Sequence, residues 1–148
     1  MSTTGLEVFD ETVHKTNTWL KDISRSTGVD RRPAYQALRA VLHALRDRLT
    51  IEEAAHLGDQ LPMLVRGIYF EGWHPAHKPE KIRSRDEFLA RIVANGADQL
   101  AMPTDDAARA VFEVLAYHID AGEIRHVIAE LPEEIRALWP HEVVEHVG

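Results

Sequence analysis

The feature that most constrains the fold of this chain is an internal repeat. Residues 37–69 align without a gap on residues 107–139 when the sequence is shifted by 70 positions. Ten aligned positions are identical, namely Ala37, Arg39, Ala40, Val41, Leu45, Glu53, His56, Leu61, Pro62 and Arg66. Repetition of this kind usually means that one copy cannot bury its apolar face alone. We therefore predict that the two copies pack around a shared core.

The periodicity of the apolar residues is helical along most of the chain. An apolar stripe with steps of three and four predicts a first helix carrying Phe9, Val13, Thr16, Leu20 and Ile23 on one face. A second stripe comprises Tyr35, Leu38, Val41, Leu42, Leu45 and Leu49. No segment alternates with a period of two, so we predict no sheet.

Several helix starts can be read from capping residues. Three pairs have the spacing of a capping box: Thr50 with Glu53, Ser84 with Glu87, and Asp120 with Glu123. Pro62 and Pro132 fit the first turn of a helix, because their missing N–H is not needed there. We expect Thr104 or Asp105 to cap a long helix that carries Val111, Phe112, Leu115 and Ile119.

These patterns predict an all-α protein. We expect residues 1–148 to form a single helical domain of two tandem four-helix repeats, about 1–73 and 84–140. A loop at 74–83 joins them, and a short C-terminal tail follows. The expected packing is one pseudo-twofold orthogonal helical bundle, with Leu61 and Leu131 fixing the entry to the fourth helix of each copy.

Composition narrows the class of protein further. The chain is 45% hydrophobic and 28% charged, which is typical of a globular domain. Its net charge of −7 argues against nucleic-acid binding, and no apolar run approaches the length of a membrane span. The absence of cysteine excludes disulfides and thiolate chemistry. We read no signal peptide at the N-terminus and expect a cytoplasmic protein that binds neither nucleic acid nor a membrane.

Three groups of residues resemble the bacterial family known as domain of unknown function 2267. They are Gln60-Leu61-Pro62, Gly72-Trp73 with the later Pro75 and Pro79, and Leu131-Pro132. The resemblance runs from about Trp19 to Trp139. It implies an all-helical bacterial protein, and it brings a fold and not a reaction, a cofactor or a partner.

Two short segments are the strongest candidates for chemistry. "EAAH" and "EIRH" place Glu53 with His56, and Glu123 with His126, three residues apart at equivalent repeat positions. This spacing is half of the pattern found in di-iron helical bundles. The alternative is structural, with both glutamates completing capping boxes and both histidines bonding a helix end. A third segment, "HEVVEH" at 141–146, does not match the spacing of a zinc-protease helix and reads as a solvated terminal helix.

Two further groups are candidates for a partner or ligand surface. Tyr69, Phe70 and Trp73 crowd the end of the first copy, where core packing competes with a pocket or a partner surface. Arg66 and Arg136 occupy equivalent positions one turn into a helix. We expect each to pair with a carboxylate of the preceding short helix, with an anion site as the alternative.

The sequence favours a non-enzymatic function. We find no catalytic constellation, nucleotide fingerprint or phosphate loop, and we expect no cofactor. The first hypothesis is a helical protein with a protein-interaction or stress-related role, whose partner is another copy of itself or another protein. The alternative is a metal-binding protein using Glu53, His56, Glu123 and His126. A third possibility is small-molecule binding between the two copies.

Overall fold

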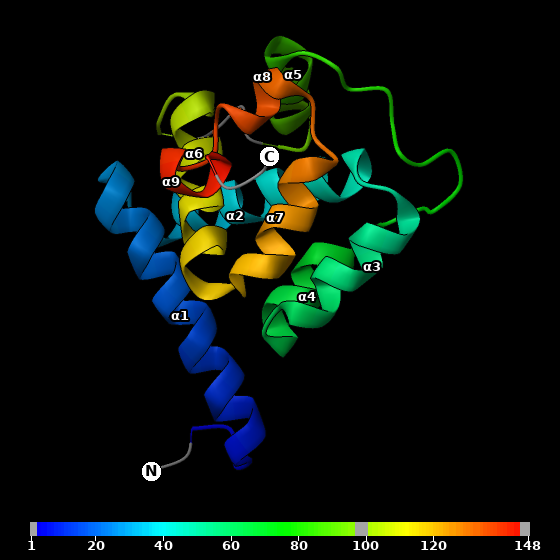
Figure 1. The fold of residues 1–148 in the computed structure, drawn as a ribbon. Helices are drawn as coiled ribbons and strands as arrows, with labels where there is room; N and C mark the ends of the chain where they lie inside the picture. Colours follow the sequence, from blue (N-terminus) through cyan, green and yellow to red (C-terminus); the bar gives the residue numbers. More distant parts are fainter. Residues whose placement is uncertain (1–2, 97–100, 146–148) are drawn as a thin grey trace.

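The chain folds into helices, as Figure 1 shows in a computed structural model that describes residues 3–96 and 101–145. Every regular element in these two ranges is a helix, which confirms the predicted all-α class. The elements are α1 (Glu7–Thr27), α2 (Arg31–Arg48), α3 (Ile51–Gln60), α4 (Met63–Phe70), α5 (Arg85–Ala94), α6 (Thr104–His118), α7 (Ala121–Ala129), α8 (Glu133–Arg136) and α9 (His141–Val144).

Helix α2 lies at the centre of the molecule. It contacts α1, α4, α5 and α6, while α3 contacts α4 and α7. One continuous core of buried side chains includes residues of α1 to α8, among them Leu42, Leu57, Phe112 and Val127. Phe112 stacks on Trp139 with ring centroids 4.1 Å apart. The hydrophobic residues of both sequence copies are therefore buried in the same core.

Helices that are equivalent in the 70-residue alignment contact each other. The pairs are α2 with α6 and α3 with α7. This is the contact pattern expected if the two copies share one core, and the pseudo-twofold arrangement of two four-helix units remains a prediction. Within the described ranges, no helix combines the length and apolar character that crossing a membrane requires.

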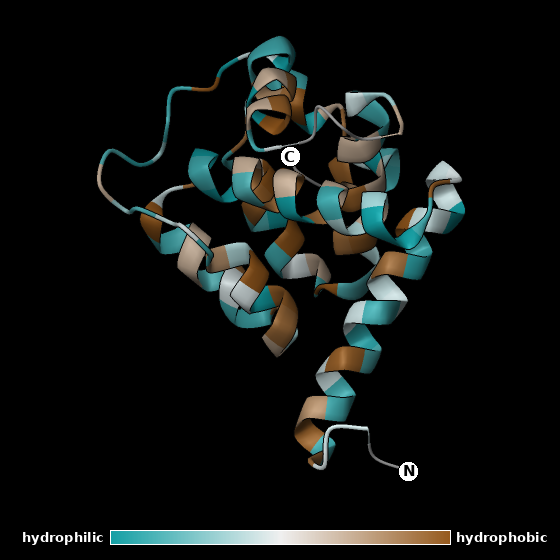
Figure 2. Cartoon of the chain, turned by 180° about the vertical axis from the view of Figure 1, so that it is seen from behind, coloured by the Kyte–Doolittle hydropathy of each residue, from teal (hydrophilic) through white to brown (hydrophobic). Residues whose placement is uncertain are grey.

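The apolar stripe of α1 is buried only along the C-terminal half of the helix. Trp19, Leu20 and Ile23 are in the core, whereas Phe9 and Val13 are 44% and 37% exposed. In Figure 1 the N-terminal half of α1 extends beyond the other helices, and Figure 2 shows hydrophobic residues recurring along it. Periodicity correctly places these side chains on one face, but the rest of the protein does not cover the whole stripe.

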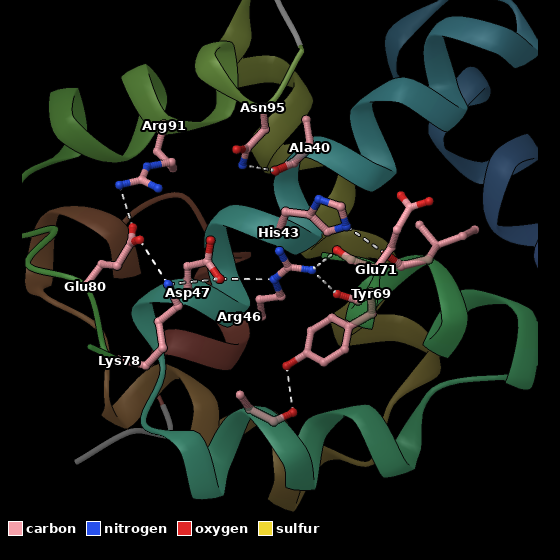
Figure 3. Close-up of polar contacts among 12 residues, drawn as sticks. Ala40, His43, Arg46, Asp47, Tyr69, Glu71, Lys78, Glu80, Arg91 and Asn95 are labelled. Carbon is pink, nitrogen blue, oxygen red and sulfur yellow. Dashed lines mark hydrogen bonds and ion pairs between the residues drawn. The ribbon is translucent and has the colours of Figure 1, made fainter. Parts of the chain in front are cut away.

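The loop at residues 71–84 is held against α2 by charged side chains (Figure 3). Arg46 is buried and donates from Nη1 to two carbonyl oxygens at the end of α4, each at 2.6 Å. The backbone N–H of Glu80 donates to the carbonyl of Asp47 at 2.8 Å. The Glu80 carboxylate also pairs with Lys78 at 3.0 Å and with Arg91 at 2.5 Å. These contacts give an irregular segment a defined position between the two copies.

Two other buried polar side chains are satisfied by backbone carbonyls. His43 Nε2 lies 2.7 Å from the carbonyl oxygen of Ile68, and burial lowers the pKa of His43, so a neutral ring donates this bond. The Tyr69 hydroxyl donates to the carbonyl of Ala54 at 2.7 Å, and burial raises the pKa of Tyr69. Both groups serve the packing of α2, α3 and α4.

Most predicted caps are present. Thr50, Ser84 and Asp120 each accept a hydrogen bond from the backbone N–H three residues later. The expectation for α6 was wrong, because Pro103 is its N-cap residue and Thr104 already belongs to the helix. Pro62 and Pro132 are likewise the N-cap residues of α4 and α8 and lie just outside the predicted first turn, and none of these three helix starts has a side-chain cap.

Candidate metal centre

Two Glu-x-x-His segments meet where α3 and α7 come into contact. Positions three apart share one face of a helix, so each segment presents a carboxylate and an imidazole on the same side. The contact between α3 and α7 brings the two faces together. One ligand atom from each of Glu53, His56, Glu123 and His126 lies within 4.8 Å of every other.

The contacts within this Glu/His cluster are close. His56 Nδ1 lies 2.8 Å from Glu123 Oε1 and 3.5 Å from Glu53 Oε2, and His126 Nδ1 lies 3.8 Å from the same Glu123 oxygen. The carboxylates are at the base of the cluster, where the Glu123 side chain is 3% exposed. The imidazoles are at its mouth, with side chains 54% and 71% exposed.

Glu123 is a buried carboxylate whose closest partner is an imidazole. His56 Nδ1 lies 2.8 Å from one of its oxygens, and among the described residues neither oxygen accepts a well-formed hydrogen bond. Buried carboxylates in proteins are normally paired, hydrogen-bonded or bound to a metal. The Glu123 carboxylate is therefore the group in the cluster whose environment is least complete.

Glu130 explains why Glu53 faces the cluster. A capping box would direct the Glu53 carboxylate back to the amide of Thr50. In the structure Glu130, at the end of α7, accepts from the Thr50 amide at 3.0 Å and also contacts the Thr50 hydroxyl. The prediction that the glutamates act as caps is thus right for their backbone N–H groups and wrong for the Glu53 carboxylate.

The electrostatics of the cluster favour bound positive charge. Burial raises the pKa of Glu53 to about 7, and the neighbouring charges of Glu123 and Glu130 add to this effect. The pKa of His56 is raised, mainly by the charge of Glu123. Glu53 and His56 therefore hold their protons to a higher pH than the isolated groups would, because Glu53 is buried and both lie beside the Glu123 carboxylate.

Two oxygens and two nitrogens at these separations are suited to a metal ion. Ligand atoms about 2.0–2.2 Å from one ion lie roughly 2.8–3.6 Å from their neighbours in octahedral or tetrahedral coordination. The three contacts above lie between 2.8 and 3.8 Å, and all four groups lie within 4.8 Å of one another, so the side chains would have to draw closer together to surround one ion. The cluster opens into a cleft of about 620 Å³ whose other walls include Glu52, Asp59 and Glu130.

Arg66 and Arg136 do not pair with carboxylates in residues 3–96 and 101–145. Arg66 donates from Nε to the carbonyl of Gly58 at 2.9 Å and from Nη2 to that of Leu61 at 3.0 Å. Arg136 donates to the carbonyls of Leu131 and Ala129, at 2.8 and 2.9 Å. The expected ion pairs are wrong, since each guanidinium instead binds free carbonyl groups at the end of the preceding helix.

The aromatic residues at the end of the first copy pack inward. Tyr69 is fully buried, and Phe70 and Trp73 pack against the core as partly buried side chains. The rings of Phe70 and Trp73 lie 5.4 Å apart. Tyr69 lies behind the Glu/His cluster, where its hydroxyl donates to the carbonyl of Ala54 and the charges of the two cluster glutamates add to the effect of burial in raising its pKa. Neither Phe70 nor Trp73 is among the four residues of the cluster.

Glu130 is the residue of this site that sequence reasoning missed. Its equivalent in the first copy is Gln60, so the repeat gave no sign of a paired function. Its bond to Thr50 joins positions that are 80 apart in the chain. Only the packing of α3 against α7 reveals it.

The fold and the cluster define an all-helical protein with a Glu/His site between two equivalent helices. The chain matches the model of the family described as "Uncharacterized conserved protein (DUF2267)" over residues 16–138. It therefore belongs to this family, which confirms the resemblance found in the sequence. A search of the curated proteins gives no match.

Proposed function

We propose that this protein binds one divalent transition-metal ion between α3 and α7. The ligands are Glu53, His56, Glu123 and His126. The observation that carries the proposal is the Glu123 carboxylate, which is buried, accepts no well-formed hydrogen bond from the described residues and faces two imidazoles and a second carboxylate. A metal ion at this point would supply the positive charge that the site lacks.

The ligand set indicates the class of metal. Imidazole nitrogen suits Zn²⁺, Fe²⁺ and Ni²⁺, while carboxylate oxygen suits Mn²⁺ and harder ions. A mixed set of two nitrogens and two oxygens therefore favours a first-row divalent ion over Ca²⁺ or Mg²⁺. Since both histidines lie at the exposed mouth of the cluster, the ion would face the acidic cleft. That cleft attracts cations and disfavours anionic substrates.

Elemental analysis of untagged protein tests this proposal. We expect about one Mn, Fe, Co or Zn per chain after loading and exhaustive dialysis, consistent with a single four-ligand site. His56→Ala and His126→Ala should each lose most of this metal and remain folded, because both side chains are more than half exposed. His141→Ala is the matched control, since His141 forms an exposed contact with Glu145 at 2.7 Å outside the cluster.

Wild-type protein that holds no metal above the level of His56→Ala would contradict the proposal. Equal loss of metal in His141→Ala would also contradict it, because binding would then belong to the exposed C-terminal histidines. Circular dichroism of each variant separates loss of the ion from loss of the fold.

A second candidate function is self-association through the uncovered stripe of α1. Phe9 and Val13 are exposed on α1, as is Leu6 just before it, and Met63 and Leu64 are exposed on α4. Phe9, Val13, Met63 and Leu64 line a shallow groove of about 530 Å³. Side chains of α1 and α4 thus form one apolar patch, and in a twofold contact the same patch of each copy would face the other. This exposed apolar patch is the observation that supports the predicted binding to another copy of the protein.

Light scattering coupled to size-exclusion chromatography tests this second candidate. We expect a dimer at micromolar concentration, and Phe9→Asp should convert it to a monomer by placing a charge in the apolar contact. Val93→Asp is the control, since Val93 is 40% exposed on α5 and does not line this groove. A wild-type protein that is monomeric at all concentrations, or a Phe9→Asp variant that remains dimeric, would overturn the candidate.

A further inference from the structure

We propose that the second copy contains a binding site for a small organic monocarboxylate with an apolar body. The site is the cleft of about 930 Å³ between α6, α8 and α9. The inference rests on a comparison between equivalent positions of the two copies. It is independent of the proposed metal centre, which lies between α3 and α7.

In the first copy, the arginine equivalent to the one that lines this cleft is bound to a carboxylate. Arg39 donates from Nε to Glu71 Oε1 at 2.9 Å, and its Nη2 lies 2.8 Å from the same oxygen. Glu71 follows the end of α4. An arginine on the long helix is thus neutralised by a carboxylate that the chain itself supplies.

The second copy keeps the arginine and loses the carboxylate. Arg109 is the equivalent of Arg39, and continuing the alignment by two residues places His141 opposite Glu71. Arg109 Nη1 donates to the carbonyl of Ala137 at 3.3 Å, and no carboxylate in residues 3–96 and 101–145 forms an ion pair with it. The guanidinium therefore has donors free to bind an anion at the position that Glu71 occupies in the first copy.

A buried tryptophan whose indole nitrogen has no partner among the described residues packs at the same cleft. Trp139 lines the cleft together with Arg109 and His141. It is 3% exposed, and its indole nitrogen has no hydrogen-bond partner in the described part of the chain. The equivalent residue in the first copy is Tyr69, whose hydroxyl is satisfied by Ala54 at 2.7 Å. The indole nitrogen is closed off from solvent, so Trp139 forms a wall of the cleft and Arg109 is the group that would bind an anion there.

The lining of the cleft indicates the chemical class of the ligand. A guanidinium group binds carboxylates through parallel N–H bonds. Leu131, Leu138 and Val144 supply apolar surface for the body of the ligand. Glu113 and Glu133 also line the cleft, so a second negative charge on the ligand would be repelled. A monocarboxylate with an apolar or aromatic body fits these walls better than a phosphate ester or a dicarboxylate.

Titration with phenylacetate, followed by NMR of the tryptophan indole N–H signals, tests the site. We expect the Trp139 signal to shift in a saturable way, with the signal assigned from Trp139→Phe, while the Trp19 and Trp73 signals stay in place. Phenethylamine and phenyl phosphate should bind at least about tenfold more weakly, because neither presents a single carboxylate to Arg109.

Two surface variants make the test specific. Arg109→Ala should weaken phenylacetate binding at least about tenfold. His141→Glu should weaken it to a similar degree, because it restores the internal carboxylate found in the first copy. Arg39→Ala is the matched control and should bind phenylacetate as the wild type does. Unchanged binding in both Arg109→Ala and His141→Glu, or no shift of the Trp139 signal, would overturn the proposal.

Discussion

Glu53 makes the stability of the metal-free protein depend on pH. Its pKa is about 7 in the folded protein, against 4.5 for the free group. Between these values the folded state binds more protons than the unfolded state, so the free energy of unfolding falls as the pH rises from about 4.5 through about 7. The raised pKa of His56 acts in the same direction above its ordinary value of 6.5.

Glu53→Gln should therefore stabilise the metal-free protein at pH 8 and leave it unchanged near pH 4. We expect a gain of about 1–2 kcal/mol at pH 8, less than the full shift implies because the cluster opens to solvent. Urea unfolding in the presence of a chelator at both pH values measures this difference. Glu52→Gln, on the same helix but outside the cluster, should show no such pH-dependent gain. A Glu53→Gln variant less stable than the wild type at pH 8 would contradict this account.

Metal should reverse the sign of the pH effect. The ligands must lose their protons to bind an ion, so metal affinity should rise between about pH 5 and pH 8. Isothermal titration with Zn²⁺ or Mn²⁺ across this range should also detect proton release in buffers of different ionisation enthalpy. Affinity that does not change with pH would show that the ion binds elsewhere.

The four residues of the cluster could be identified from sequence because the repeat preserves them. Glu and His recur at the same spacing in both copies, and a spacing of three residues fixes them to one helix face. The orientation of the carboxylates could not be read in the same way. It depends on Glu130, which reaches Thr50 from a helix distant in the chain and replaces the local capping contact of Glu53.

At the scale of single elements, the two copies use an arginine to end a short helix. Arg66 binds carbonyls at the end of α3, and Arg136 does the same for α7. Carbonyl groups at a helix C-terminus lack partners and carry partial negative charge. Sequence analysis placed both arginines correctly next to the preceding helix. The predicted acceptors were carboxylates, and the observed ones are backbone carbonyl groups. Every residue has a carbonyl group, so the residue types give no sign of which ones are free.

Arg66→Ala and Arg136→Ala should each lower the free energy of unfolding by about 1–3 kcal/mol, because half-buried carbonyls lose a charged donor. Chemical unfolding measures both values, and Arg32→Ala, in the exposed first turn of α2, is the control and should change stability by less than about 0.5 kcal/mol. If Arg66→Ala and Arg136→Ala lose no more stability than this control, water must hydrogen-bond the carbonyl groups as well as the arginines do.

The helix pattern itself was predictable, with exceptions that have local causes. Capping residues and apolar stripes located most helix starts, since both depend on neighbouring residues. The N-terminal half of α1 shows what periodicity does not predict. Its stripe has the same periodicity as a buried face, but whether Phe9 and Val13 are covered depends on elements elsewhere in the fold. Periodicity predicts which residues share a face and not what packs against it.

At the scale of the whole molecule, the repeat predicted a shared core, and side chains from both copies lie in one buried cluster. The loop at 71–84 could be recognised only as irregular. Its attachment through Arg46, Asp47 and Glu80 combines buried charges from distant parts of the chain. The pseudo-twofold relation of the copies remains a prediction, and the contacts between α2 and α6 and between α3 and α7 are the features that support it.

The central claim of this account is that equivalent helices of the two copies meet around a metal ion. Anomalous X-ray diffraction from crystals grown with Mn²⁺ or Zn²⁺ tests it most directly. We predict one strong anomalous peak about 2.0–2.3 Å from ligand atoms of Glu53, His56, Glu123 and His126. Crystals in which these four side chains contact only each other or water, with any ion bound elsewhere, would contradict the claim.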